Sequence, residues 1–125
     1  MSRRAVLLER LARKRQADRM QEARKVNLAL AALSRTDDQL TALQGILPEV
    51  ETTDPLPPGA LKARHSLSMV IVEQIEQARQ LQDEQRRSVD KARTALAQAE
   101  LRARLTEDHA QIAKTAQATA TDLGT

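Results

Sequence analysis

The positions of the helix-breaking residues constrain the fold more than any other feature of this sequence. All four prolines and two of the three glycines lie between positions 45 and 59. Proline lacks a backbone donor and clashes with the preceding helical turn, and glycine weakens a helix through its conformational freedom. The stretches on either side are free of both residues, so the sequence predicts an all-α protein with one helix over about 3–45, a loop over about 46–59 and a second helix over about 60–122.

Apolar side chains recur along both predicted helices at alternating spacings of three and four residues, which is typical of a coiled-coil seam. In the first helix the stripe consists of Ala5, Leu8, Ala12, Ala23, Val26, Leu30, Leu33, Leu40 and Leu47, with Asp37 interrupting it. In the second helix it consists of Ile71, Ile75, Ala78, Val89, Ala92, Leu96, Ala99, Ala103, Ala110 and Ala113, with Gln82, Gln85 and Thr106 interrupting it. Isolated helices of this polarity are marginal, so we expect each to bury its stripe against the other in one antiparallel coiled-coil hairpin spanning residues 1–125.

The loop position also predicts a register for this hairpin. If the chain reverses at the middle of the loop, residues whose numbers add to roughly 106 face each other, so Met1 lies near Leu105 and Gln39 lies opposite Leu67. The last ~20 residues would then extend ~30 Å beyond the first helix. Because that overhang is rich in alanine, we expect it to fray or to wait for a partner.

Composition narrows the function further. The chain has no Phe, Trp, Tyr or Cys, which excludes disulfides and thiolate metal sites and fits a reducing, cytoplasmic setting. Its longest apolar run, residues 28–33, is far shorter than the ~20 residues that span a bilayer, so no membrane span is expected. His65 and His109 are isolated, and no catalytic or phosphate-binding motif is present. We expect no enzyme activity, no cofactor and no metal site.

The first 25 residues are strongly basic, with nine Lys/Arg against three Asp/Glu. The candidate binding residues there are Arg3, Arg4, Arg10, Arg13, Lys14 and Arg15. Such a segment can be a solvated helix face, with the interleaved acids as partners, or it can bind an acidic protein surface. Nucleic acid is the less favoured partner, because the chain has no aromatic side chain to stack on a base.

Two stretches are apolar on every side of their helices, namely residues 28–33 (Leu-Ala-Leu-Ala-Ala-Leu) and 69–72 (Met-Val-Ile-Val). In the predicted register they lie within about two turns of each other and form an apolar belt. This belt can be a wider core face, a homodimer contact or a docking patch for another protein. In the docking interpretation, whichever of Val70 and Val72 faces outward binds the partner, with Leu67 or Ile71 beside it.

Three short segments give the chain a resemblance to a known family. Residues 8–14 (Leu-Glu-Arg-Leu-Ala-Arg-Lys), 39–43 (Gln-Leu-Thr-Ala-Leu) and 75–77 (Ile-Glu-Gln), arranged around a mid-chain loop, are similar to the flagellar export protein FliJ family and the related stalk proteins of injectisome type III secretion systems. The resemblance covers nearly the whole chain.

The resemblance implies a cytoplasmic component peripheral to the inner-membrane flagellar export apparatus, built as an antiparallel coiled coil. It also implies three partners: the hexameric export ATPase, the export-gate membrane protein and export chaperones. By position, the implied gate-contacting residues are Gln39, Leu43, Leu67, Ile71 and Ala78. Two alternatives stay open, a structural coiled-coil homodimer or scaffold with no export role, and a basic helical nucleic-acid binder.

Overall fold

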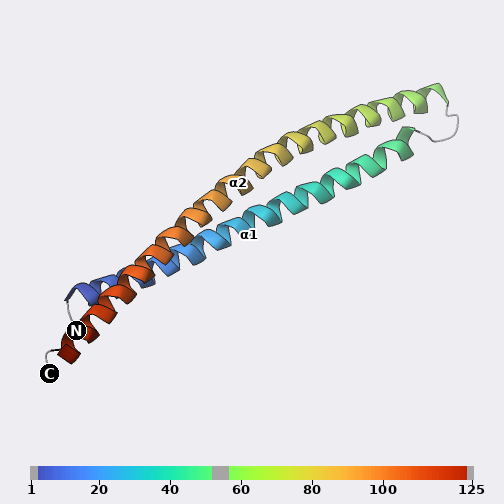
Figure 1. The fold of residues 1–125 in the computed structure, drawn as a ribbon. Helices are drawn as coiled ribbons and strands as arrows, with labels where there is room; N and C mark the ends of the chain where they lie inside the picture. Colours follow the sequence, from blue (N-terminus) through green and yellow to red (C-terminus); the bar gives the residue numbers. More distant parts are fainter. Residues whose placement is uncertain (1–2, 52–56, 124–125) are drawn as a thin grey trace. The chain divides into compact units, whose positions relative to one another are not determined.

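Two long helices make up the fold. The computed structural model describes residues 3–51 and 57–123, with side chains placed to residue 120, and all of these residues except Pro57 are helical. Helix α1 comprises Arg3–Glu51 and helix α2 comprises Pro58–Leu123 (Figure 1). The two helices pack against each other, so the predicted all-α helical hairpin is confirmed.

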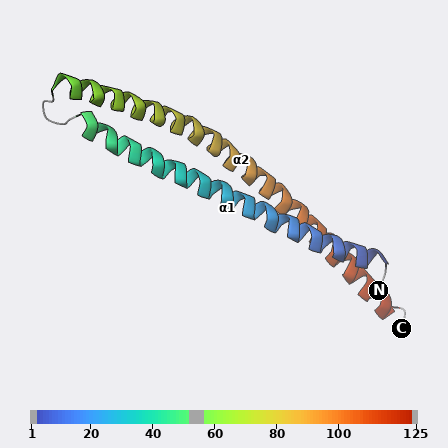
Figure 2. The ribbon, with the colours of Figure 1, turned by 180° about the vertical axis from the view of Figure 1, so that it is seen from behind.

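The chain divides into two compact units, each containing a segment of both helices. The terminal unit comprises Met1–Asn27 and Asp90–Thr125, and the loop unit comprises Leu28–Val89. In the terminal unit Glu9 pairs with Lys114 at 3.6 Å, while Gln16, further along α1, contacts the earlier residue Glu107 of α2. The two segments of this unit are therefore antiparallel, and Figure 2 shows the same ribbon from behind.

The loop unit has the larger core side chains. Its buried cluster comprises Leu40 from α1 with Ile71, Ile75 and Ala78 from α2, and Leu43, Leu47 and Val50 pack against it. Spacings of three and four residues keep these side chains on one face of each helix. Burial of this apolar face is the main stabilising term available to such a pair of helices.

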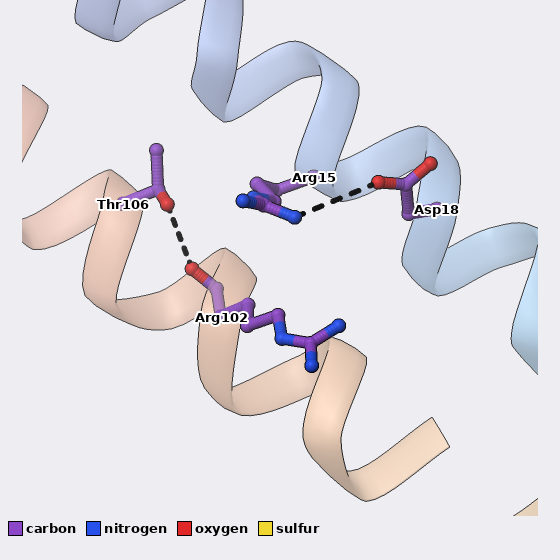
Figure 3. Close-up of polar contacts among 4 residues, drawn as sticks. All are labelled: Arg15, Asp18, Arg102 and Thr106. Atoms are coloured by element: carbon purple, nitrogen blue, oxygen red, sulfur yellow. Dashed lines mark hydrogen bonds and ion pairs between the residues drawn. The ribbon is translucent and has the colours of Figure 1, made fainter. Parts of the chain in front are cut away.

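The terminal unit is held by much smaller side chains. Its buried apolar residues are Ala5 and Val26 on α1 and Ala99 and Ala103 on α2. Thr106 is also buried, and its hydroxyl donates to the Arg102 carbonyl of its own helix at 2.8 Å (Figure 3). This bond within the helix satisfies a polar group in the seam without a partner from α1.

Helix α1 is longer than its sequence predicts. We expected it to end near residue 45, but it continues through Gly45 and Pro48 to Glu51. Pro48 lies in the last turn, where its missing N–H removes one hydrogen bond from the end of the helix rather than from its middle. Packing of Leu47 and Val50 on the core cluster favours the extra turn. Residues 52–56 of the predicted loop lie outside the described part of the chain.

Helix α2 begins slightly before the predicted position. Pro58 is its first residue, and the Leu61 amide donates to the Pro57 carbonyl at 2.9 Å. Proline is well suited to the first helical position, because its N–H would have no partner there and its φ angle is already helical.

The predicted register is wrong by 13 to 17 residues. It places Asp37 opposite residue 69, whereas Gln82 donates to the Asp37 carboxylate at 2.6 Å. It places Glu9 opposite residue 97, whereas Glu9 pairs with Lys114. The predicted overhang is therefore also wrong, because Lys114 lies alongside α1, and Ala110 and Ala113 are half-buried.

The physical reason is that large side chains, rather than the loop, set the axial position of one helix against the other. In the predicted register Leu40 would face Ser66 and Leu33 would face Glu73. In the observed register Leu40 packs in one cluster with Ile71, Ile75 and Ala78. A register that aligns the large apolar side chains of both helices buries more apolar surface than a register centred on the loop.

A polar layer interrupts the seam of the loop unit. Asp37 on α1 and Gln82 on α2, two of the predicted interruptions, are half-buried and hydrogen-bonded to each other. Gln85 lies one seam position further along α2, and its side-chain oxygen is buried without a hydrogen-bond partner among the described residues. The layer is thus partly satisfied, and the unpaired oxygen lowers stability.

Truncation of the central core residue tests the packing. We expect Leu40→Ala to lower the free energy of unfolding by about 2–4 kcal/mol, because it removes a buried side chain and leaves a cavity. The control Leu28→Ala alters a side chain that is 70% exposed, and we expect it to change stability by less than about 0.5 kcal/mol. Urea denaturation followed by far-UV circular dichroism measures both, and equal losses would contradict the assigned core.

Leucine substitutions at the two neighbouring glutamines of the polar layer should change the stability of the protein in opposite directions. Gln85→Leu removes the unpaired oxygen and is expected to raise stability by about 1 kcal/mol. Gln82→Leu leaves the Asp37 carboxylate half-buried without its donor, so the same substitution should lower stability by about 1–3 kcal/mol. Thermal unfolding of the two variants gives the comparison, and shifts of the same sign would refute the assigned pairing.

Candidate protein interface

The basic segment of α1 projects most of its charges into solvent. Arg10, Arg13 and Lys14 are exposed and have no ion pair with any residue that the structure describes. Arg3 and Arg4 at the start of the helix are exposed as well. Exposed charges without counter-charges keep their field in solution and attract an acidic surface over a distance of about a Debye length.

Arg15, the remaining candidate of the basic segment, is less accessible than the other five. Arg15 is half-buried and lies 4.0 Å from Asp18, on the turn of α1 that faces Thr106 of α2 (Figure 3). Lys25 pairs with Glu22 at 3.3 Å, so some acids of the segment do neutralise nearby bases. Arg15 is therefore the predicted basic residue least available to a partner.

Net charge differs strongly between the two units. The terminal unit has 14 Lys/Arg and 8 Asp/Glu, whereas the loop unit has 6 and 9. The α2 segment of the terminal unit has five of each sign, so the whole excess of that unit comes from the first 25 residues of α1. The chain therefore offers a basic surface in one unit and a mildly acidic one in the other.

Within the loop unit the three residues 70–72 point in different directions. Ile71 is 6% exposed and belongs to the core cluster, while Val70 and Val72 are 48% and 45% exposed. Two residues on a helix are separated by roughly 200° when they are two positions apart, so the valines lie on opposite flanks of the hairpin. Val72 borders a depression that Glu51 and His65 also line, which places these three on one flank.

The flank that contains Val70 carries no charge from Leu67 to Leu81 on α2, where Glu84 ends the uncharged stretch three residues later. On α2 it presents residues at spacings of three and four, and on α1 it presents the half-buried side of the core stripe with the positions next to it. We call this surface the uncharged flank. It consists of Gln39, Leu43, Ile46, Val50, Leu67, Val70, Gln74, Gln77 and Leu81.

The opposite flank of the same unit is charged. On α2, the residues that continue the stripe of Val72 are Glu76, Arg79, Asp83 and Arg86, all exposed. The two flanks of one hairpin unit therefore differ in chemistry, although the same two helices form both. A solvated helix has charges on both sides of its buried stripe, so the uncharged flank needs a separate explanation.

Several predicted contact residues are not part of this surface. Ile71 and Ala78 are buried between the helices and are inaccessible to a partner while the hairpin is closed. The apolar belt is also wrong as drawn, because in the observed register residues 69–72 lie beside the end of α1 and residues 28–33 lie some 20 Å further along that helix. Gln39 and Leu67 share the uncharged flank without facing each other directly.

Sequence reasoning missed five residues of the flank, namely Ile46, Val50, Gln74, Gln77 and Leu81. Their signal is present in the sequence as an absence of charge at the positions adjoining one side of the core stripe. For Ile46 and Val50 this signal was hidden because the loop prediction assigned residues 46–50 to the turn rather than to the helix. For Gln74, Gln77 and Leu81 it could be recognised only once the core face of α2 was known.

Across the described residues, no three His, Asp or Glu side chains are grouped so that they could hold a metal ion. No described helix contains a segment that is long and apolar enough to cross a membrane. Comparison of the chain with known protein families, with curated proteins and with solved structures finds no match.

Serine substitutions test the assigned exposure of the three consecutive residues. We expect Val70→Ser and Val72→Ser each to lower stability by less than about 1 kcal/mol, because half of each side chain is already in water. Ile71→Ser should cost about 3–4 kcal/mol through lost burial and a cavity. Denaturant unfolding ranks the three variants, and a loss at Val70 as large as that at Ile71 would place Val70 in the core.

Proposed function

We propose that the chain is a stalk and chaperone-escort component of the bacterial flagellar type III protein export apparatus. Three segments support this, at residues 8–14, 39–43 and 75–77, which resemble the FliJ family. The antiparallel helical hairpin agrees with the architecture that the resemblance implies. In this role the chain is cytoplasmic, peripheral to the inner membrane, and binds the hexameric export ATPase, the export gate and export chaperones.

The observation that carries the proposal is the exposure of Arg10, Arg13 and Lys14 in the terminal unit, where they have no ion pair with any described residue. Because most side chains of a helical hairpin lie along its outer sides, it is suited to act by presenting those sides and its ends to other proteins. Arg10, Arg13 and Lys14 would meet acidic side chains of the ATPase ring. Attraction between a basic stalk and an acidic pore raises the rate of association and selects the end of the hairpin that enters.

The contact with the export gate belongs to the other unit in this proposal. Of the residues that the resemblance implies, Gln39, Leu43 and Leu67 lie on the uncharged flank, where Val70 joins them. Ile71 and Ala78 act indirectly, because they hold the two helices in the register that creates this flank.

A second candidate function is a structural coiled-coil homodimer or scaffold with no export role. The uncharged flank favours it, because such a surface suits another helix pair as well as it suits an export-gate protein. The two candidates differ in what the basic segment does, since a scaffold needs no acidic partner.

Reversal of charge at the basic segment tests the export role. The variant Arg10→Glu, Arg13→Glu and Lys14→Glu should slow association with the purified hexameric export ATPase by ~10-fold or more at low salt and should flatten its salt dependence, because the attraction that steers the encounter is lost. Stopped-flow or biolayer measurements over a salt series give both quantities.

A matched control changes the same number of charges elsewhere. The variant Arg79→Glu, Arg86→Glu and Arg87→Glu alters three exposed arginines of the loop unit and should bind nearly as the unmodified chain does. Circular dichroism checks that both variants keep their helices. Equal rates for all three proteins, or no binding by the unmodified chain, would contradict the proposed function.

A further inference from the structure

We infer that the uncharged flank of the loop unit is the interface for a second copy of this chain, which packs on it about a two-fold axis to form four helices in that unit. The inference specifies the contact of the homodimer named above as the second candidate function, and it does not depend on the export role. Because the proposed export-gate contact uses the same flank, a copy that is paired in this way cannot contact the gate through it. It rests on the chemistry of the flank, on the contrast with the opposite flank and on the large apolar side chains that the flank leaves exposed.

The chemistry of the flank suits an identical partner. In a two-fold contact each surface meets a copy of itself, so any charge on it meets a like charge or must find a counter-charge on the same surface. The flank has none, and therefore two copies approach without repulsion and without burying an ion. Gln39, Gln74 and Gln77 each carry a donor and an acceptor, so their amides can bond to the same amides of a second copy.

The apolar residues of the flank are large. Leu67 and Val70 on α2 and Ile46 on α1 are 43% to 51% exposed, although each lies next to the buried cluster. A β-branched residue loses side-chain freedom in a helix, so exposed valine and isoleucine do not help the isolated hairpin. Their burial by a second copy would stabilise the assembly.

The opposite flank explains why the assembly closes as a pair. It carries Glu76, Arg79, Asp83 and Arg86, whose burial would require desolvation of four charges. A single self-complementary surface gives a closed dimer. Two different surfaces that complement each other would instead give an open polymer.

Two neighbouring valines provide the experiment. Val70 and Val72 are the same residue type on the same helix, are almost equally exposed, and differ in the flank on which they lie. Sedimentation equilibrium of the full chain, from micromolar to near-millimolar concentration, measures the dimer dissociation constant. We expect Val70→Glu to raise it at least ~10-fold, because each copy buries a carboxylate in an uncharged contact, and Val72→Glu to leave it within about twofold.

A second measurement locates the contact directly. The chain has no cysteine, so Gln74→Cys and the control Gln80→Cys each introduce one spin-label site. Labels at position 74 should give a shorter distance between copies than labels at position 80, and Val70→Glu should abolish both signals. A chain that is monomeric throughout the concentration range would overturn the inference. Equal effects of the two valine variants, or a shorter distance at position 80, would overturn it as well.

These outcomes are separate from those of the ATPase experiment. If the chain dimerises through Val70 but does not bind the ATPase, this inference stands and the export role is refuted. A chain that binds the ATPase through its basic segment but shows no dimer keeps the export role and refutes this inference.

Discussion

The cluster formed by Leu40, Ile71, Ile75 and Ala78 determines how the two helices of the loop unit meet. Helices with a repeating seam can slide against each other by whole heptads with little change in pattern, so something must select one position. The large side chains do so, because they pack together in the observed register, whereas the register centred on the loop would pair Leu40 with Ser66 and Leu33 with Glu73. The pairing of Asp37 with Gln82 then follows, since both interruptions arrive at the same level.

That register also decides which residues are exposed. Residue 71 faces α1, so its neighbours 70 and 72 are turned to opposite flanks, and the chemistry of each flank is set by which residues occupy the adjoining positions. One flank continues as Glu76, Arg79 and Asp83, and the other continues as Gln74, Gln77 and Leu81. The difference in charge between the two flanks of the loop unit is therefore a consequence of how its core packs.

The fold class was predictable from the sequence, whereas the register was not predicted. Pro and Gly confined to one segment and apolar residues spaced by three and four are local signals, and they correctly gave two helices and their buried stripes. Axial position depends on contacts between distant residues, and the symmetric loop was a poor guide to it. The interruptions at Asp37, Gln82 and Gln85 could have supplied the answer, because polar groups in a seam are best placed opposite each other.

The candidate surfaces were likewise predictable where their signal is local in the sequence, and not where it depends on contacts between distant residues. The basic segment was visible in the composition and does project into solvent, except for Arg15, whose half-burial depends on its place beside the seam. On α2, the exposed Val70 and Val72 could not be told apart from the buried Ile71 until the core face was known. Ile46 and Val50 were overlooked because a proline and a glycine nearby indicated a loop, while packing on the core cluster kept them helical.

The small side chains in the seam of the terminal unit have a dynamic consequence. Alanine buries little apolar surface, so Ala5, Ala99 and Ala103 hold their helices together with less free energy than Leu40 and its neighbours provide. Separation of the α1 and α2 segments in the terminal unit is then a sub-global opening that leaves the loop unit closed. Each separated segment is marginal as an isolated helix, so its backbone amides would exchange their hydrogens as it unwinds, and more readily than those beside Leu40.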